Sequence, residues 1–198
     1  MVREAQISAC EAEHMEAVVN RRLDAVRYSK ETHEHIDRVA ACSAQIAAAM
    51  GLSAEEVELI KKAAAYHDIG KHEVPDALLN KPGPLSQEER KIMETHAARG
   101  WSYLMVSVSP IYQAGAKIAK QHHERWNGTG YPEGLRGRQI HLYGRIVAVA
   151  DVYDALTAER VYKKPWPLED VLGHFEEMSG ILYDPDVILA FLRIHGRP

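Results

Sequence analysis

The sequence has little cysteine, no excess of positive charge and no long apolar run, and each shortage excludes a class of protein. Cys10 and Cys42 are its only cysteines, too few for a disulfide framework, so we expect reduced thiols and a cytoplasmic location. A net charge of -4 argues against a broad basic surface for DNA or RNA. No apolar run is long enough for a membrane span, and the first residues lack the apolar core of a signal peptide. We therefore expect no DNA, RNA or membrane partner.

The remaining composition is that of an ordinary globular protein. Hydrophobic residues make up 46% of the 198 positions and charged residues 26%. A chain of this length can bury a sizeable core within one domain. Apolar residues recur at helical spacing along most of the chain, without β-strand alternation or an internal repeat. The sequence therefore predicts an all-α fold, a compact helical bundle.

An amphipathic helix is predicted near the start of the chain, over residues 7–27. Its apolar positions recur at helical spacing and are Met15, Val19, Leu23 and Val26. We assign residues 1–28 to an N-terminal helix and residues 29–198 to the main domain. The helix either covers the core or couples the domain to a signal or a second copy of the chain.

Three local signals place the ends of the other predicted helices. Serine followed three residues later by glutamate is typical of a capping box, proline suits the first helical turn, and glycine ends a helix. A glycine-rich stretch without helical period, residues 125–143, predicts a long functional loop. The predicted helices run from about Glu31 to Met50, Ser53 to Gly70, Ser86 past His96, Pro110 to His123, Arg145 to Glu159, and onward from Pro185.

Imidazole and carboxylate side chains are spaced so that helices could bring them to one point. Asp151 stands in an otherwise apolar helix, where an unpaired carboxylate is costly and a cation would compensate it. Taken singly, each of these residues has an ordinary role as a core histidine, a helix cap or an ion-pair partner. The set that suggests a site for more than one divalent cation is His35, His67, Asp68, His96, His122, His123 and Asp151.

The motifs around these residues resemble those of the HD-GYP domain, a branch of the HD metal-dependent phosphohydrolases. The strings are HDIGK (67–71), HHERWNGTGYP (122–132) and DVYDALTAERVYK (151–163), within a resemblance that covers residues 29–193. The resemblance implies an HD-type helical bundle. It also implies a phosphodiesterase that hydrolyses the bacterial second messenger cyclic di-GMP to pGpG and, in some members, to GMP.

The resemblance also implies a metal-ligand set. One metal would be held by His35, His67, Asp68 and Asp151, and a second by Asp68, His96, His122 and His123. Glu31 matches a position that helps to retain a third metal in some members, although it could simply be a solvated glutamate in a first helical turn. Because no cysteine is in the set, iron or manganese suits it, and the sequence does not choose between them.

Four further residues match positions near the substrate. Lys71 matches a lysine directed at the scissile phosphate, and it is assigned a catalytic role together with Asp68. Arg160 and Lys163 match positions that contact substrate phosphates, but a solvated face is an alternative for both. Tyr131, in the GYP loop, could contact either the substrate or a partner protein.

Two other functions remain open at this point. The same metal chemistry could act on another cyclic dinucleotide or nucleotide, or the domain could be a nucleotide-responsive interaction module without turnover. Members of the family commonly follow a sensory domain, and none precedes Met1 here. Regulation is therefore expected from expression, from a partner (a regulatory protein or a second copy of the chain), or from sequence outside the given residues.

Overall fold

The computed structural model describes residue 17 and the ranges 33–159 and 164–197. Apart from residue 17, the predicted helix over residues 7–27 lies outside these residues, and so does the domain boundary at residue 28. Within the described ranges the fold is helical, and β-structure is limited to two isolated bridges, so the all-α prediction is confirmed. No helix built from these residues has the length and apolar character to cross a bilayer.

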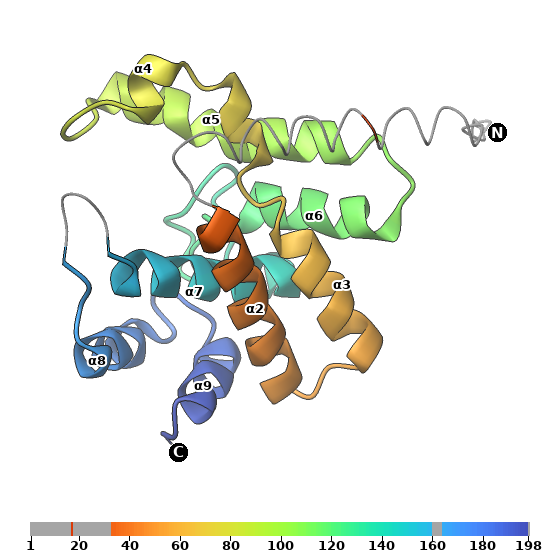
Figure 1. Ribbon diagram of the computed structural model, residues 1–198, viewed down its shortest axis with the longest axis vertical. Helices are drawn as coiled ribbons and strands as arrows, with labels where there is room; N and C mark the ends of the chain where they lie inside the picture. The colour runs from red at the N-terminus through yellow and green to blue at the C-terminus, as the bar shows by residue number, and fades with distance from the viewer. Residues whose placement is uncertain (1–16, 18–32, 160–163, 198) are drawn as a thin grey trace.

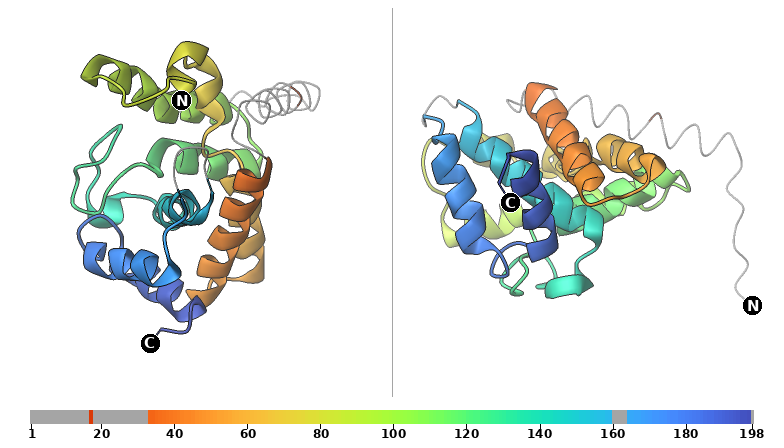
Figure 2. Two further views of the ribbon diagram at one scale, coloured as in Figure 1. Left: turned by 60° about the vertical axis from the view of Figure 1, so that its left-hand side comes forward. Right: turned by 90° about the horizontal axis from the view of Figure 1, so that it is seen from below.

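Two antiparallel helix pairs and a central helix make up most of the bundle (Figure 1). The long helices are α2 (His33–Ala49), α3 (Ala54–Ala64), α5 (Gln87–Leu104), α6 (Pro110–Gln121), α7 (Leu142–Thr157), α8 (Leu168–Met178) and α9 (Pro185–Ile194). Helix α2 packs beside α3, and α5 packs beside α6. Helix α7 contacts α2, α6, α8 and α9, and the left view of Figure 2 shows it surrounded by them.

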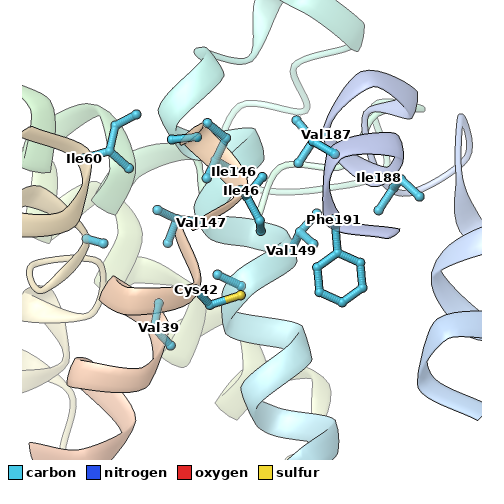
Figure 3. Close-up of a cluster of buried hydrophobic side chains, with 14 of the residues drawn as sticks. Val39, Cys42, Ile46, Ile60, Ile146, Val147, Val149, Val187, Ile188 and Phe191 are labelled. Carbon is cyan, nitrogen blue, oxygen red and sulfur yellow. The ribbon is translucent and has the colours of Figure 1, made fainter. Parts of the chain in front are cut away.

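The main core lies where α7 meets α2, α3 and α9 (Figure 3). Ile46 from α2, Ile60 from α3, Ile146 from α7 and Phe191 from α9 are completely buried. Burying one such side chain contributes roughly 1.5–3 kcal/mol. Because α7 is apolar on nearly every side, it can be enclosed by neighbours and serve as a fixed support for polar residues at its C-terminal half.

The predicted caps form as expected. The hydroxyl of Ser53 accepts a hydrogen bond from the Glu56 amide at 3.3 Å, and the Glu56 carboxylate accepts one from the Ser53 amide at 3.4 Å. Ser86 and Glu89 make the same reciprocal pair at 3.3 and 2.8 Å. Gly51 ends α2 with φ of 81°, a conformation that glycine adopts without strain. Local sequence therefore sets these helix ends.

Two predicted boundaries are wrong. The helix expected to run to Gly70 ends at Ala64, and after a turn the chain forms the 3-10 helix η1 (Ile69–Glu73). Helix α7 begins at Leu142, three residues before the predicted Arg145, because the His141 imidazole accepts a hydrogen bond from the Tyr143 amide at 3.2 Å. Two shorter helices also occur: α4 (Asp76–Leu79), and η2 (Gly137–Gln139) within the stretch predicted as a loop.

The segment after α3 makes a close backbone contact with α5 at Gly70. A Cβ at this position would lie 2.0 Å from the carbonyl oxygen of His96 and 2.6 Å from the amide nitrogen of Gly100. Helix α5 therefore touches the η1 backbone directly. A straight continuation of α3 would not place a glycine against α5 in this way.

Gly70→Ala is expected to destabilise the fold by about 3 kcal/mol or more, because a methyl group must displace backbone rather than a side chain. It should also move His96. Gly173→Ala in α8 is the matched control, because a Cβ there meets nothing within 4 Å and alanine favours helix by roughly 1 kcal/mol. Urea unfolding of both variants measures the difference. Equal stabilities for the two would contradict the close contact.

Candidate metal centre

The seven predicted ligands come together in two neighbouring groups. In each group, the candidate donor atoms lie within 4.8 Å of one another. They come from α2, the turn after α3, α5, the end of α6, and α7 (Figure 1). One group is His35, His67 and Asp151, and the other is Asp68, His96, His122 and His123.

Asp68 faces both groups. Its Oδ2 lies 3.2 Å from Nε2 of His67. Its Oδ1 lies 3.3 Å from Nε2 of His96 and 3.7 Å from Nε2 of His122. One carboxylate thus offers one oxygen to each group, which is the geometry of a ligand that bridges two cations.

The turn after α3 makes this arrangement possible. Adjacent residues on a continuous α-helix point about 100° apart. Because α3 ends at Ala64, His67 and Asp68 leave helical geometry and both face the cluster. The segment that was wrongly predicted to continue α3 therefore carries His67 and Asp68, which belong to different donor groups.

The imidazoles are oriented with Nε2 toward the cluster. His67, His96 and His122 each place Nδ1 against a backbone carbonyl oxygen three residues earlier, at 2.9, 2.7 and 3.1 Å. A carbonyl oxygen only accepts, so Nδ1 carries the proton and Nε2 keeps its lone pair. Neutral imidazoles with converging Nε2 lone pairs are suited to bind a divalent cation.

Buried polar atoms in the second group lack hydrogen-bond partners within the described part of the chain. They are Asp68 Oδ1, His96 Nε2 and His122 Nε2. Leaving one such atom unsatisfied costs roughly 1–3 kcal/mol. Three of them around one point are explained by a cation, so these residues fit a metal ion.

The protonation states agree with cation binding. Burial lowers the pKa of His96 to about 4 and that of His123 well below its usual range. Burial opposes ionisation of Asp68, but Lys71 and the neighbouring imidazoles outweigh it, and its pKa falls well below the ordinary value. Near neutral pH His96 and His123 are therefore neutral and Asp68 is ionised.

These shifts predict that the metal-free protein loses stability in mild acid. The pKa of His96 is about 4 in the folded protein and ~6.5 in the unfolded chain. Between these values the unfolded chain binds the extra proton, so the stabilisation is present above pH 6.5 and is lost as the pH falls toward 4. Urea unfolding of chelated protein between pH 7 and pH 5 should show this loss.

His96→Leu should make that pH dependence shallower, because the titrating group is removed. His33→Gln is the control, since His33 is exposed at the start of α2. An unchanged slope in His96→Leu would show that His96 does not titrate in this window.

The GYP loop covers one side of the second group. The ring of Tyr131 stacks on His123 with centroids 4.8 Å apart and planes 30° from parallel. Beside it lies an open hollow of about 370 Å³. The hollow is lined by Lys91, Glu94, Thr95, Ala98, Arg99, Ser102, Tyr131 and Pro132.

Two buried carboxylates near the centre were missed by the sequence prediction. Glu124 accepts hydrogen bonds from the backbone amides of Glu133 and Leu135 at 2.8 and 2.9 Å, and so ties down the GYP loop. Asp154 contacts the imidazole of His35. The only sequence signal for Asp154 was its position one helical turn after Asp151.

The other predicted site residues fall into two classes. Nζ of Lys71 lies 2.6 Å from Oδ2 of Asp68, with the side chain 20% exposed, so it stands at the edge of the cluster. Glu31, Arg160 and Lys163 lie outside the described residues, and their roles stay predictions.

The fold and the site define a helical protein with a buried cluster of histidines and aspartates that could bind metal. The sequence matches the HD domain family over residues 13–187, and the chain belongs to that family. Among its relatives is a cyclic di-GMP phosphodiesterase of Thermotoga maritima, 51% identical over 164 residues, which are 83% of this chain and 45% of that protein. The resemblance to HD-GYP proteins is therefore confirmed.

Two further relatives differ in the substrate that their names give. The cyclic di-GMP phosphodiesterase response regulator RpfG of Xanthomonas campestris is 43% identical over 82% of this chain and 43% of its own. The 3'3'-cGAMP-specific phosphodiesterase 2 of Vibrio cholerae is 41% identical over 83% of this chain and 31% of its own. The chain thus spans less than half the length of these relatives.

Solved structures share the fold. A cyclic GMP-AMP-specific phosphodiesterase of Vibrio cholerae superposes with a TM-score of 0.64 at 21% identity, over 94% of this chain and 49% of that one. The HD domain of the Listeria monocytogenes phosphodiesterase PgpH gives 0.57 at 18% identity, over 88% and 97%. At these identities the likeness establishes the bundle alone.

Proposed function

We propose that this chain is a metal-dependent phosphodiesterase that hydrolyses cyclic di-GMP to pGpG, with GMP as a further product. The observation that carries the proposal is the position of Asp68, with one carboxylate oxygen toward each group of donors. A bridging carboxylate is the feature of a two-metal site, which suits cleavage of a phosphodiester. The names of the relatives supply the substrate class.

Two cations would be held by the residues already described. His35, His67, Asp68 and Asp151 would form the first site, and Asp68, His96, His122 and His123 the second. Imidazole and carboxylate ligands without thiolates suit iron or manganese. A third ion at Glu31 remains part of the proposal. When bound, such cations polarise a phosphodiester and make water a better nucleophile near neutral pH.

Lys71 is proposed to act on the same phosphate. Its ammonium group lies against Asp68 and is partly exposed, so it can reach a phosphate that approaches the cluster. A fixed positive charge there stabilises the negative charge that develops on the phosphoryl oxygens. Arg160 and Lys163 are proposed to contact the second phosphate of the dinucleotide.

Tyr131 and the hollow beside it are proposed to receive a nucleobase. Tyr131 joins the hollow to the cluster, because its ring both lines the hollow and stacks on His123. Burial raises the pKa of its phenol, so the ring stays neutral. A neutral aromatic face suits stacking on guanine. Lys91, Glu94 and Arg99 also line the hollow, and Arg99 is paired with Glu73 at 2.7 Å.

A second substrate is favoured by a specific relative. The Vibrio cholerae enzyme at 41% identity is named for 3'3'-cGAMP, which carries the same two phosphodiester bonds. We also propose a regulatory protein or a second copy of the chain as a partner, with residues 1–28 either packing on the domain or coupling it to that partner.

Anaerobic loading with iron or manganese, followed by incubation with cyclic di-GMP, 3'3'-cGAMP and cyclic di-AMP, tests the proposal. Chromatography of the products distinguishes pGpG from GMP. His35→Gln should lose turnover, whereas His33→Gln, an exposed histidine two residues away, should keep it. Binding of a dinucleotide by metal-loaded protein without any cleavage would instead identify an interaction module.

A further inference from the structure

His35 differs from the other described ligands in the partner of its Nδ1 atom. Where His67, His96 and His122 contact a backbone carbonyl, Nδ1 of His35 donates to a carboxylate oxygen, Oδ2 of Asp154, at 2.6 Å. Asp154 is 4% exposed and lies 119 residues away along the chain. A carboxylate makes the imidazole a stronger electron donor than a carbonyl does.

Asp154 is held in place from the opposite side by Arg38. The guanidinium donates from Nε to Oδ1 and from Nη2 to Oδ2, the latter at 3.2 Å. Hydrogen bonds from His35 on one side and Arg38 on the other therefore fix the position of the Asp154 carboxylate.

The other end of His35 points at the first group. Its Nε2 lies 3.3 Å from Nε2 of His67 and 3.6 Å from Oδ1 of Asp151. The hydrogen-bonded series Arg38–Asp154–His35 thus ends at Nε2 of His35, a candidate metal-donor atom. Within the described residues, no ligand of the second group shows a comparable carboxylate behind its ring.

We propose that Asp154 is a positioning residue that fixes the Nδ1–H tautomer of His35 and makes the His35, His67 and Asp151 site the tighter of the two. This inference rests on the proposed function only in requiring that both sites bind a cation. Asp154 touches neither cation nor substrate, and it acts through the imidazole.

The test is a Co²⁺ titration of the chelated full chain, followed by its visible absorption. The parent should show two binding steps, and His35→Gln and His96→Gln assign one step to each group. Asp154→Asn keeps an acceptor for Nδ1–H but loses the charge, and Asp154→Ala loses both. Loss of such a partner weakens metal binding about 10- to 100-fold. That loss should fall on the first step alone and be greater for alanine.

Asp184→Asn is the matched control. Asp184 is equally buried and paired with an arginine, Arg145, but it does not contact a ligand histidine. Asp184→Asn should lower the stability of the fold without weakening either Co²⁺-binding step selectively. If Asp154→Asn fails to fold, the double variant with Arg38→Gln removes the uncompensated charge and is titrated instead.

The outcomes separate this inference from the proposed function. Two steps in the parent, with the first selectively weakened in the Asp154 variants, support the inference. Unchanged affinities, or an equal loss at both steps as from a general folding defect, overturn it and leave the metal sites standing. A parent that binds no Co²⁺ refutes the proposed function itself.

Discussion

Asp68→Ala is expected to abolish turnover and to weaken both cation sites at once. Among the described residues Asp68 is the carboxylate that faces both donor groups, so its removal takes an oxygen ligand from each. It also removes the carboxylate oxygen that lies 2.6 Å from Nζ of Lys71. We expect turnover to fall at least ~1000-fold, on the order of 4 kcal/mol in the activation free energy.

Metal content and turnover of the variant should be measured on the same preparation. Asp37→Ala is the matched control, because Asp37 is an exposed carboxylate on α2, two residues after His35. It should retain both metal and activity. A variant of Asp68 that keeps two bound ions and parental turnover would show that this carboxylate does not bridge them.

Removal of the metal is expected to have an equally large effect on activity and a clear effect on stability. The orphaned atoms Asp68 Oδ1, His96 Nε2 and His122 Nε2 would lose their proposed partner, so chelated protein should be inactive and less stable. Adding iron or manganese back to about 100 times its dissociation constant should stabilise the fold by roughly 2.7 kcal/mol. Thermal unfolding with and without metal measures this change.

Asp68→Ala serves as the control for this experiment as well, because metal should no longer stabilise it. Activity that survives exhaustive chelation would contradict the metal-dependent mechanism. Stabilisation of Asp68→Ala to the same degree as the parent would place the metal elsewhere on the protein.

Much of the fold followed from short-range patterns. The capping boxes at Ser53 and Ser86 and the left-handed Gly51 are local devices that act within a few residues. The end of α3 was mispredicted because Gly70 responds to α5, which lies far along the chain. A helix boundary set by such a contact has no local signal.

The types of ligand could be predicted from the sequence, because helical periodicity and residue chemistry are properties of neighbouring positions. Their assignment to two cation sites came from the resemblance to HD-GYP domains. Tertiary packing decided which oxygen of Asp68 faces which group, and that Asp154 stands behind His35 across 119 positions. Such contacts join segments that only the folded bundle brings together, with α7 as their common support. Distances between segments so far apart depend on the packing of the whole bundle.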